Sequence, residues 1–152
     1  MRPDFFIRDL KIQDRPDWEE LWARYCEFYH QQLDPVVIET TWMRLNDPAE
    51  PIFGLVAEHG GILVGFTHCV LHRGTWALNN ICYLEDLYVT PEMRREGVGR
   101  KLVEAVYARA DELRCERVYW LTHESNKTAR MLYDQIAVRT GFIQYRRDPR
   151  GD

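Results

Sequence analysis

The sequence predicts an α/β protein in which helices interleave with a largely continuous β-sheet. Three observations indicate this class. Aromatic residues recur at the spacing of one helical face between residues 16 and 29, apolar runs of strand length follow between residues 52 and 89, and a strongly amphipathic segment spans residues 98–113. Because helical and strand-like segments alternate along the chain, we expect a three-layer sandwich with the sheet in the middle.

The first third of the chain contains one predicted strand and two predicted helices. Residues 5–9 form the strand, and Pro16 begins a helix for which Asp14 is the expected cap. A second helix begins at Pro35 and ends before the turn signals Asp47-Pro48 and Glu50-Pro51.

The period then changes to that of strands. Residues 52–58 and 62–71 are predicted strands joined by a tight turn at His59-Gly60-Gly61, and residues 81–89 are a third long strand. The helix over residues 98–113 has an apolar face that we expect to be buried, made of Leu102, Val103, Val106, Ala110 and Leu113.

The last quarter of the chain completes the predicted order βααβββαβαβ. Residues 118–122 form a strand, Ser125 or Asn126 caps a helix that runs beyond Tyr133, and residues 142–146 form a final strand.

The composition indicates one globular domain, residues 1–152, without a nucleic-acid partner. The chain has 152 residues, a net charge of −4 and 29% charged residues, which is enough length for one buried core. Its only tight basic cluster is a local anion site at most, made of Arg94, Arg95, Arg100 and Lys101. The overall acidity favours cationic partners.

Neither the cysteines nor the histidines indicate a metal site. None of the four cysteines lies in a C-x-x-C pair, and the five histidines show no metal-ligand spacing. Residues 1–9 contain no signal-peptide apolar segment, and no apolar run approaches the roughly 20 residues that cross a bilayer. These observations predict a cytoplasmic protein that binds no metal and does not contact a membrane.

The segment between residues 90 and 99 carries the strongest chemical signal. It connects a strand to a helix and contains Arg94, Gly97 and Gly99. A helix N-terminus presents N–H groups and the positive end of its dipole, and glycines let the backbone curl around an anion. No Walker G-x-x-x-x-G-K-[ST] string occurs, and Leu102 stands where a dinucleotide fingerprint needs its third glycine. The pattern therefore predicts a pyrophosphate site of another kind.

The motif Arg94-x-x-Gly97-x-Gly99 resembles the R/Q-x-x-G-x-G/A coenzyme A loop of the GNAT acetyltransferases. Asn126-x-x-Ala129-x-x-Leu132-Tyr133, followed by Gly141-Phe142, resembles the downstream motif of that superfamily. The string from Tyr83 to Val89 is similar to the matching strand of spermidine/spermine acetyltransferases, and the long interval between Tyr133 and Gly141 is similar to that of the yeast Hpa-type acetyltransferases. The resemblance implies a GNAT-type α/β/α sandwich around a mixed, mostly antiparallel sheet, with acetyl-CoA as cosubstrate.

The resemblance also implies which residues bind acetyl-CoA. Leu87, Tyr88 and Val89 would contact the pantetheine arm through their backbone, and Asn126 would hydrogen-bond the same arm, with Tyr133 at its reacting end. The pyrophosphate would be held by the backbone N–H groups of Arg94, Arg95, Glu96, Gly97, Val98, Gly99 and Arg100.

Acetyl transfer to an amine needs a base for the amine, a donor for the carbonyl oxygen and an acid for the leaving thiolate. Tyr133 is the predicted acid, because it lies seven residues after Asn126 on the same helical face and the resemblance gives that role to the matching tyrosine. The resemblance assigns the base to Glu85. Asp86, which a regular strand would turn to the opposite face, is the less favoured alternative. A covalent route through a cysteine is disfavoured, since no cysteine has an evident basic partner.

The predicted acceptor is a small primary amine, such as a polyamine or an amino acid, which attacks directly in a ternary complex. An aromatic helical face can hold a cation as well as form core. That face consists of Trp18, Trp22, Tyr25 and Tyr29. Two alternatives stay open, namely acetylation of protein lysines or N-termini, and a non-catalytic acyl-CoA-binding regulatory module. Family members often dimerise, so a homodimer is possible.

Overall fold

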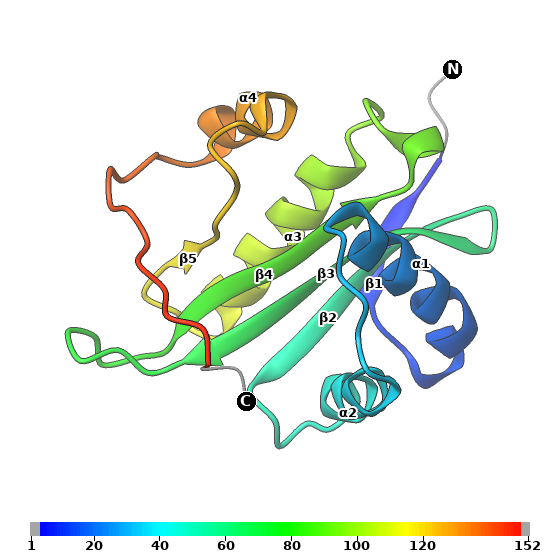
Figure 1. The fold of residues 1–152 in the computed structure, drawn as a ribbon, viewed down its shortest axis with the longest axis horizontal. Coiled ribbons are helices and arrows are strands. Elements are labelled where there is room, and N and C mark those ends of the chain that lie inside the picture. The colour runs from blue at the N-terminus through cyan, green and yellow to red at the C-terminus, as the bar shows by residue number, and fades with distance from the viewer. Residues whose placement is uncertain (1–3, 150–152) are drawn as a thin grey trace. The chain divides into compact units, whose positions relative to one another are not determined.

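The structure, a computed structural model, describes residues 4–149 (Figure 1). These residues belong to two compact units, which divide between Leu121 and Thr122. The first unit holds a β-sheet with helices on both of its faces, and the second holds one helix followed by an extended segment. The two units are described separately.

The sheet of the first unit has five strands in the order of the chain. They are β1 (Phe6–Asp9), β2 (Ile52–His59), β3 (Ile62–His72), β4 (Ile81–Val89) and β5 (Val118–Tyr119). Neighbouring strands pair antiparallel from β1 to β4, and β4 pairs parallel with β5. The predicted mixed, mostly antiparallel sheet is thereby confirmed.

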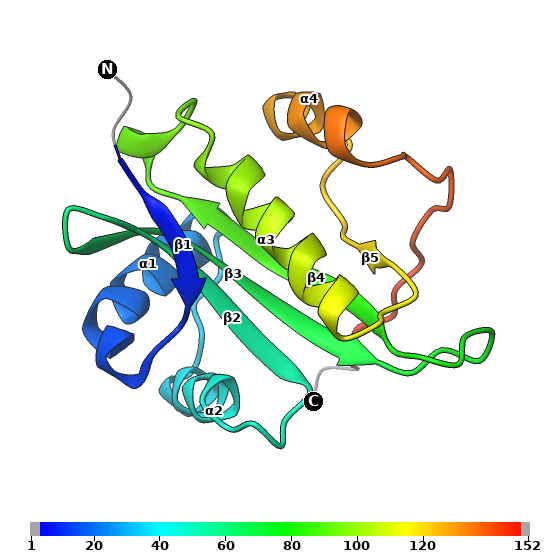
Figure 2. The same cartoon turned by 180° about the vertical axis from the view of Figure 1, so that it is seen from behind.

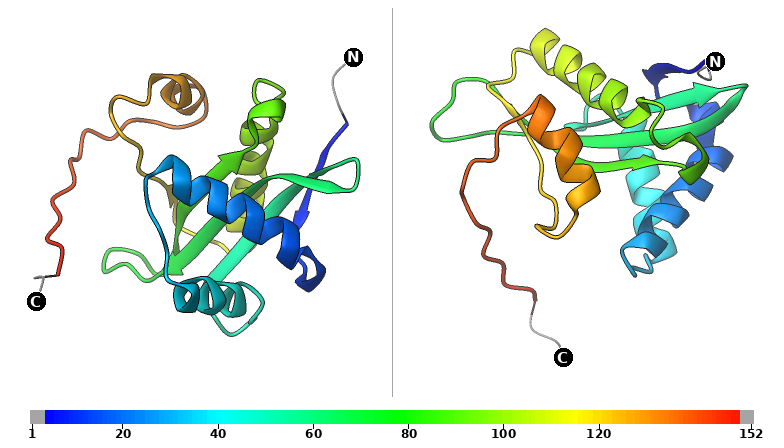
Figure 3. Two further views of the ribbon diagram at one scale, coloured as in Figure 1. Left: turned by 45° about the vertical axis from the view of Figure 1, so that its right-hand side comes forward. Right: turned by 90° about the horizontal axis from the view of Figure 1, so that it is seen from above.

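Three helices cover the two faces of this sheet (Figures 1, 2 and 3). The helices α1 (Arg15–Phe28) and α2 (Pro35–Leu45) pack on one face, against β3 and β2 respectively. The helix α3 (Val98–Glu112) lies across β2, β3 and β4 on the opposite face. The interleaved order predicted from the sequence therefore produces the expected α/β/α layers.

Each face of the sheet has its own buried core. On the face of α1 and α2 the core is aromatic, with Trp18, Trp22, Trp42 and Phe66 all buried. On the face of α3 it is aliphatic, with Val98, Leu102, Val103 and Val106 buried. Gly65 of β3 permits this second contact, because a β-carbon there would lie 2.9 Å from the carbonyl oxygen of Tyr88 and 3.3 Å from the Leu102 and Val98 side chains. The absence of a side chain at Gly65 therefore allows α3 to pack closely against β3.

The second unit contains α4 (Lys127–Ile136). Asn126 caps this helix, since its side-chain oxygen accepts a hydrogen bond from the N–H of Ala129 at 3.5 Å. Residues 137–149 contain no helix or strand, so the predicted strand over residues 142–146 is wrong. A strand forms only where its backbone pairs with another strand, and a local apolar pattern does not supply that partner.

Two further details differ from the sequence-based expectations. The strand β5 covers only two residues of the predicted 118–122. Leu113, expected on the buried face of α3, is the residue that ends the helix and is 47% exposed. Both differences fall at the ends of elements, where local patterns are least informative.

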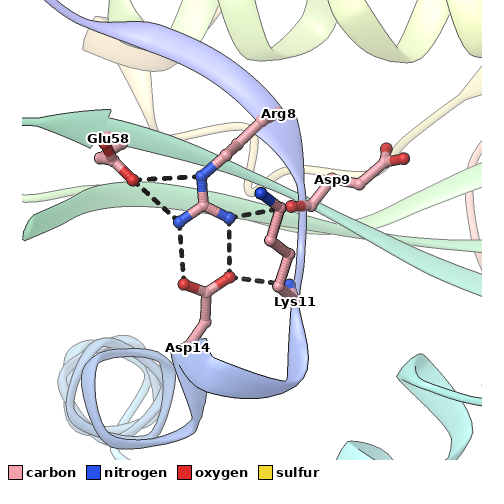
Figure 4. A network of polar contacts seen from close by, with 5 residues as sticks. All are labelled: Arg8, Asp9, Lys11, Asp14 and Glu58. Atoms are coloured by element: carbon pink, nitrogen blue, oxygen red, sulfur yellow. Dashed lines mark hydrogen bonds and ion pairs between the residues drawn. The ribbon is translucent and has the colours of Figure 1, made fainter. Parts of the chain in front are cut away.

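Asp14 stands at the start of α1 but does not cap that helix with its side chain. Its carboxylate instead accepts two hydrogen bonds from the Arg8 guanidinium, both at 2.8 Å, and one from the backbone N–H of Lys11 at 2.7 Å (Figure 4). Arg8 also donates to Glu58 of β2 at 3.1 and 2.9 Å. This half-buried network fastens the beginning of α1 to the edge of the sheet, and the hydrogen bonds from Arg8 lower the pKa of Asp14.

We expect Asp14→Asn to lower the free energy of unfolding by about 2 kcal/mol at pH 7, because charge-assisted hydrogen bonds of a half-buried carboxylate are lost. The lowered pKa of folded Asp14 means that its stabilisation is present above the unfolded pKa and is lost as pH falls through the folded value. Urea unfolding should therefore show the difference between wild type and variant shrinking below about pH 4.

Glu20→Gln serves as the matched control, because Glu20 pairs with Arg24 on the exposed surface of α1. It should change the free energy of unfolding by less than about 0.5 kcal/mol. Equal effects of the two variants would contradict the anchoring role of Asp14.

Candidate active site

The loop between β4 and α3 has the backbone of an anion-binding turn. A short helical turn over Pro91–Met93 leads to Arg95, whose φ of 69° is unusual for a residue with a side chain, and to Gly97, whose φ is 86°. A β-carbon on Gly97 would meet no atom within 4 Å, so open space lies beside the turn. The helix α3 begins immediately afterwards and has no side-chain cap. Its first-turn N–H groups and dipole make this opening suited to an anion.

Positive charge surrounds this turn. Arg94 and Arg95 are exposed, whereas Glu96 is half-buried. The Arg94 side chain turns back over β4, where its Nε donates to the carbonyl oxygen of Val89 at 3.1 Å and its guanidinium lies 5.9 Å from the centre of the Tyr88 ring. The loop and the end of β4 are thus joined into one surface.

The outer edge of β4 is paired over only part of its length. The β4–β5 ladder joins Cys82 to Val118 and Tyr83 to Tyr119. Stacking of the Tyr83 and Tyr119 rings and a 2.8 Å hydrogen bond between the Tyr119 hydroxyl and His72 hold β5 at this point. Beyond Tyr83, within residues 4–149, β4 pairs with β3 alone. Its free edge, which includes residues 87–89, can hydrogen-bond an extended ligand.

A β-bulge interrupts β4 at the predicted base. His68 pairs with Asp86 and Cys69 pairs with Leu84, so Glu85 has no partner on β3. The expectation that Glu85 and Asp86 point to opposite faces assumed a regular pleat, and the bulge removes that assumption. The strand period alone therefore does not decide which of the two carboxylates faces the site, and the assignment of the base to Glu85 stays a prediction.

A buried hydrogen-bond chain reaches Asp86 from the core. The indole Nε1 of Trp18 lies 2.9 Å from Nε2 of His68, and Nδ1 of His68 lies 3.0 Å from an Asp86 carboxylate oxygen. Trp18 and His68 are buried. The spacing of the histidines, which bears only on metal ligation, predicts no role for His68. Its position in the middle of an apolar strand, where a polar ring needs a partner, was the available signal.

Two neighbours on either side of Asp86 respond to its charge. Burial and the nearby Asp86 carboxylate raise the pKa of Tyr25 well above its usual range. Partial burial of the Glu85 carboxyl and the adjacent Asp86 carboxylate raise the pKa of Glu85. A carboxylate with a raised pKa is a better proton acceptor near neutral pH.

The predicted aromatic face of α1 runs from core to surface. Trp18 is fully buried, Trp22 and Tyr25 stack with ring centres 5.4 Å apart, and Tyr29 is 39% exposed. Tyr25 in turn lies with its ring centre 6.3 Å from that of Tyr88 on β4. This face therefore forms core at one end and borders Asp86 and β4 at the other.

The remaining predicted residues, Asn126 and Tyr133, belong to the second unit. Besides capping α4, Asn126 donates through Nδ2 to the Thr122 hydroxyl at 3.3 Å. Tyr133 lies in the second half of the same helix. The roles of both residues stay predictions.

A surface hollow of about 420 Å³ lies elsewhere in the first unit, lined by α1, the β2–β3 hairpin and the residues that follow β4. None of the predicted site residues lines it. Over residues 4–149, no cluster of His, Cys, Asp and Glu suited to a metal ion is found. Within the same residues, every helix is too short or too polar to cross a membrane.

The start of α3 follows a glycine turn and has no side-chain cap, and the adjacent edge of β4 is paired with β5 at only two residues. These features give the α/β protein a surface suited to a phosphate-bearing ligand. The chain belongs to the acetyltransferase (GNAT) family, whose sequence pattern it matches over residues 13–137. This confirms the prediction of an acetyl-CoA-dependent N-acetyltransferase.

Individual proteins show the same likeness. The chain is 38% identical over 144 residues to the D-amino-acid N-acetyltransferase HPA3 of Saccharomyces cerevisiae, which covers 93% of this chain and 89% of that protein. It is 34% identical over 155 residues to the thialysine N-epsilon-acetyltransferase of Mus musculus, which covers 92% and 90%. Among solved structures, AAC(6')-Iy in complex with a coenzyme A bisubstrate analogue has the same fold, with a TM-score of 0.81, 17% identity, and 96% and 99% of the two chains covered.

The residues of the first unit fit acetyl-CoA. The open turn at Gly97 and the uncapped start of α3 suit a pyrophosphate, and the exposed arginines supply charge. The unpaired edge of β4 suits the amide groups of a pantetheine arm.

Replacement of Gly97 tests the backbone of this turn. We expect Gly97→Ala to lower the free energy of unfolding by about 1–2 kcal/mol, because a β-carbon disfavours the left-handed conformation even where space is free. Gly97→Asn should cost less, since asparagine tolerates this conformation better. Equal urea midpoints for the two variants would contradict the assigned strain.

Proposed function

We propose that this protein transfers the acetyl group of acetyl-CoA to the primary amine of a small cationic molecule, such as an amino acid or a polyamine. The observation that carries the proposal is the β-bulge, which leaves the Glu85 carboxylate without a partner on β3, next to Asp86, on the strand that leads into the coenzyme turn. Carboxylates attract a cationic amine and can take its proton. A regulatory module that only binds acyl-CoA would not require this pair.

The names of the relatives support a small amine. HPA3 is named for D-amino acids and the mouse protein for thialysine, which both carry amino groups. The aromatic end of α1 is consistent with such a substrate, because Tyr25, Tyr29 and Tyr88 offer ring faces near Asp86.

The proposed reaction is direct attack in a ternary complex. Bound acetyl-CoA supplies a thioester whose carbonyl carbon accepts the amine nitrogen as the carbon–sulfur bond breaks. Glu85 accepts the proton that the amine loses, directly or through water, and the Tyr133 hydroxyl donates a proton to the departing sulfur. A backbone N–H at the end of β4, that of Val89, stabilises the carbonyl oxygen as charge develops. Each proton thereby has a named donor or acceptor.

We further propose that the two units act together as one acetyltransferase domain in the cytoplasm, and that the protein can form a homodimer. The family match supports the single domain, because residues 13–137 extend across both units. Size-exclusion chromatography with light scattering measures the oligomeric state directly.

Thiol release from acetyl-CoA tests the activity. We expect release that depends on an added amine when polyamines, D- and L-amino acids, aminoglycosides and lysine peptides are compared. Mass spectrometry of the product should show a gain of one acetyl group on a primary amine. Binding of acetyl-CoA without release with any amine would instead support the non-catalytic module.

Tyr133→Phe tests the predicted acid. Loss of the hydroxyl should lower kcat at least about 100-fold, the usual contribution of a general acid, while the dissociation constant for acetyl-CoA changes little. Stopped-assay kinetics and calorimetry measure the two quantities, and Tyr145→Phe in the exposed C-terminal segment provides the control. An unchanged kcat in Tyr133→Phe would remove this tyrosine from the mechanism.

A further inference from the structure

The chain from Trp18 through His68 to Asp86 fixes where its protons lie. An indole N–H can only donate, so Nε2 of His68 must accept, and the ring's one proton must be on Nδ1. That proton is then donated to the Asp86 carboxylate 3.0 Å away. Each polar atom along the chain therefore has one defined role as donor or acceptor.

The same chain joins three elements around the bulge. Trp18 belongs to α1, His68 to β3 and Asp86 to β4, directly after the unpaired Glu85. The rings of Phe66, Trp22 and Trp18 surround the imidazole with centres 4.7, 4.8 and 6.0 Å away, which prevents it from turning. The Asp86 carboxylate is consequently held in one orientation.

We propose that Trp18 and His68 are positioning residues that hold the Asp86 carboxylate beside Glu85, so that the fixed charge of Asp86 sets the pH range in which Glu85 accepts the amine's proton. The inference rests on the proposed function, since it concerns the base of that reaction. Neither positioning residue needs to touch the substrate, because both act through Asp86.

Other titratable groups around the two carboxylates do not replace this role. Those that interact with Glu85 or Asp86 come from α1, β3, β4 and β5 and are Tyr25, Cys26, His68, Cys69, Tyr83 and Tyr119. Burial or a neighbouring thiol raises the pKa of each tyrosine and cysteine in this set, so all five are neutral near pH 7. The negative charge beside Glu85 is therefore that of Asp86, the next residue of the chain at the bulge.

The test is the pH profile of kcat/KM for the best amine of the panel, read as the ratio of the value at pH 6 to that at pH 8. The ionised form of Glu85 is the active one, so activity falls as pH falls through its raised pKa. Removing the Asp86 charge lowers that pKa and moves the acid limb to lower pH. Asp86→Asn should therefore raise the ratio by about threefold, the change that half a pH unit produces.

Trp18→Phe should shift the profile in the same direction by a smaller amount. Without the indole donor, nothing holds the proton of His68 on Nδ1, so the hydrogen bond that orients the Asp86 carboxylate beside Glu85 is weakened. His68→Gln should keep the wild-type ratio, because one side-chain amide offers an acceptor to Trp18 and a donor to Asp86. Trp42→Phe removes a neighbouring indole of the same core, with its ring centre 4.8 Å from that of Trp18, and should also keep the wild-type ratio.

The outcomes separate the two proposals. Wild-type ratios in Asp86→Asn and Trp18→Phe, with an active wild-type enzyme, would overturn the positioning role and leave the proposed function intact. Loss of all activity in Asp86→Asn with activity retained in Glu85→Gln would make Asp86 the base and also overturn it. No acetyl transfer by wild type to any amine would overturn the proposed function itself. Calorimetric binding of acetyl-CoA verifies that each variant is folded, and Asp86→Asn with His68→Gln suffices if Trp18→Phe does not fold.

Discussion

The single-residue bulge at Glu85 is the constraint on which the rest of the site depends. By leaving Glu85 unpaired, it brings Asp86 opposite His68 and lets Tyr88 pair with Phe66. Without the extra residue, every side chain between the bulge and the coenzyme turn would change faces, because side chains in a strand alternate. The apolar Tyr88 would then leave the core, and Asp86 would lose its buried partner. The bulge therefore sets the chemical site and the packing of the strand end at once.

A buried polar chain is a costly way to join a helix to a sheet, since any group left unsatisfied loses its bonds to water. Trp22 shows the contrast: its indole nitrogen is buried without a partner, whereas that of Trp18 has His68. An unsatisfied buried donor costs about 1–3 kcal/mol. The chain through His68 is fully satisfied, and a satisfied network specifies one arrangement of its members. Its members come from α1, β3 and β4, so the network fixes the position of α1 on the sheet relative to these two strands.

Most of the fold was predictable from the sequence, because its helices and strands have clear periods and turn residues. The glycine turn before α3 was predictable for the same reason, since Arg94, Gly97 and the following helix are local features, and its role toward acetyl-CoA stays a prediction. The bulge and the hydrogen bond between His68 and Asp86 were not, because both depend on how β3 and β4 align. The strand over residues 142–146 failed on the same ground, as a strand needs a partner that local sequence does not specify. Features that depend on neighbouring residues in the chain could be predicted, whereas features that depend on the pairing of distant strands could not.

This difference follows from how the two halves of the site are made. The coenzyme side consists of backbone groups and a glycine turn, so it tolerates varied side chains provided that Gly97 keeps its conformation. The proposed acceptor side consists of side chains from α1, β3 and β4, whose contacts change with each substitution. Relatives named for D-amino acids and for thialysine can therefore match more than nine-tenths of this chain while differing in acceptor. Under the proposed function, acceptor choice is accordingly to be sought around Tyr25, Glu85 and Asp86, where α1 meets the bulge, because the turn before α3 would contact the coenzyme and not the amine.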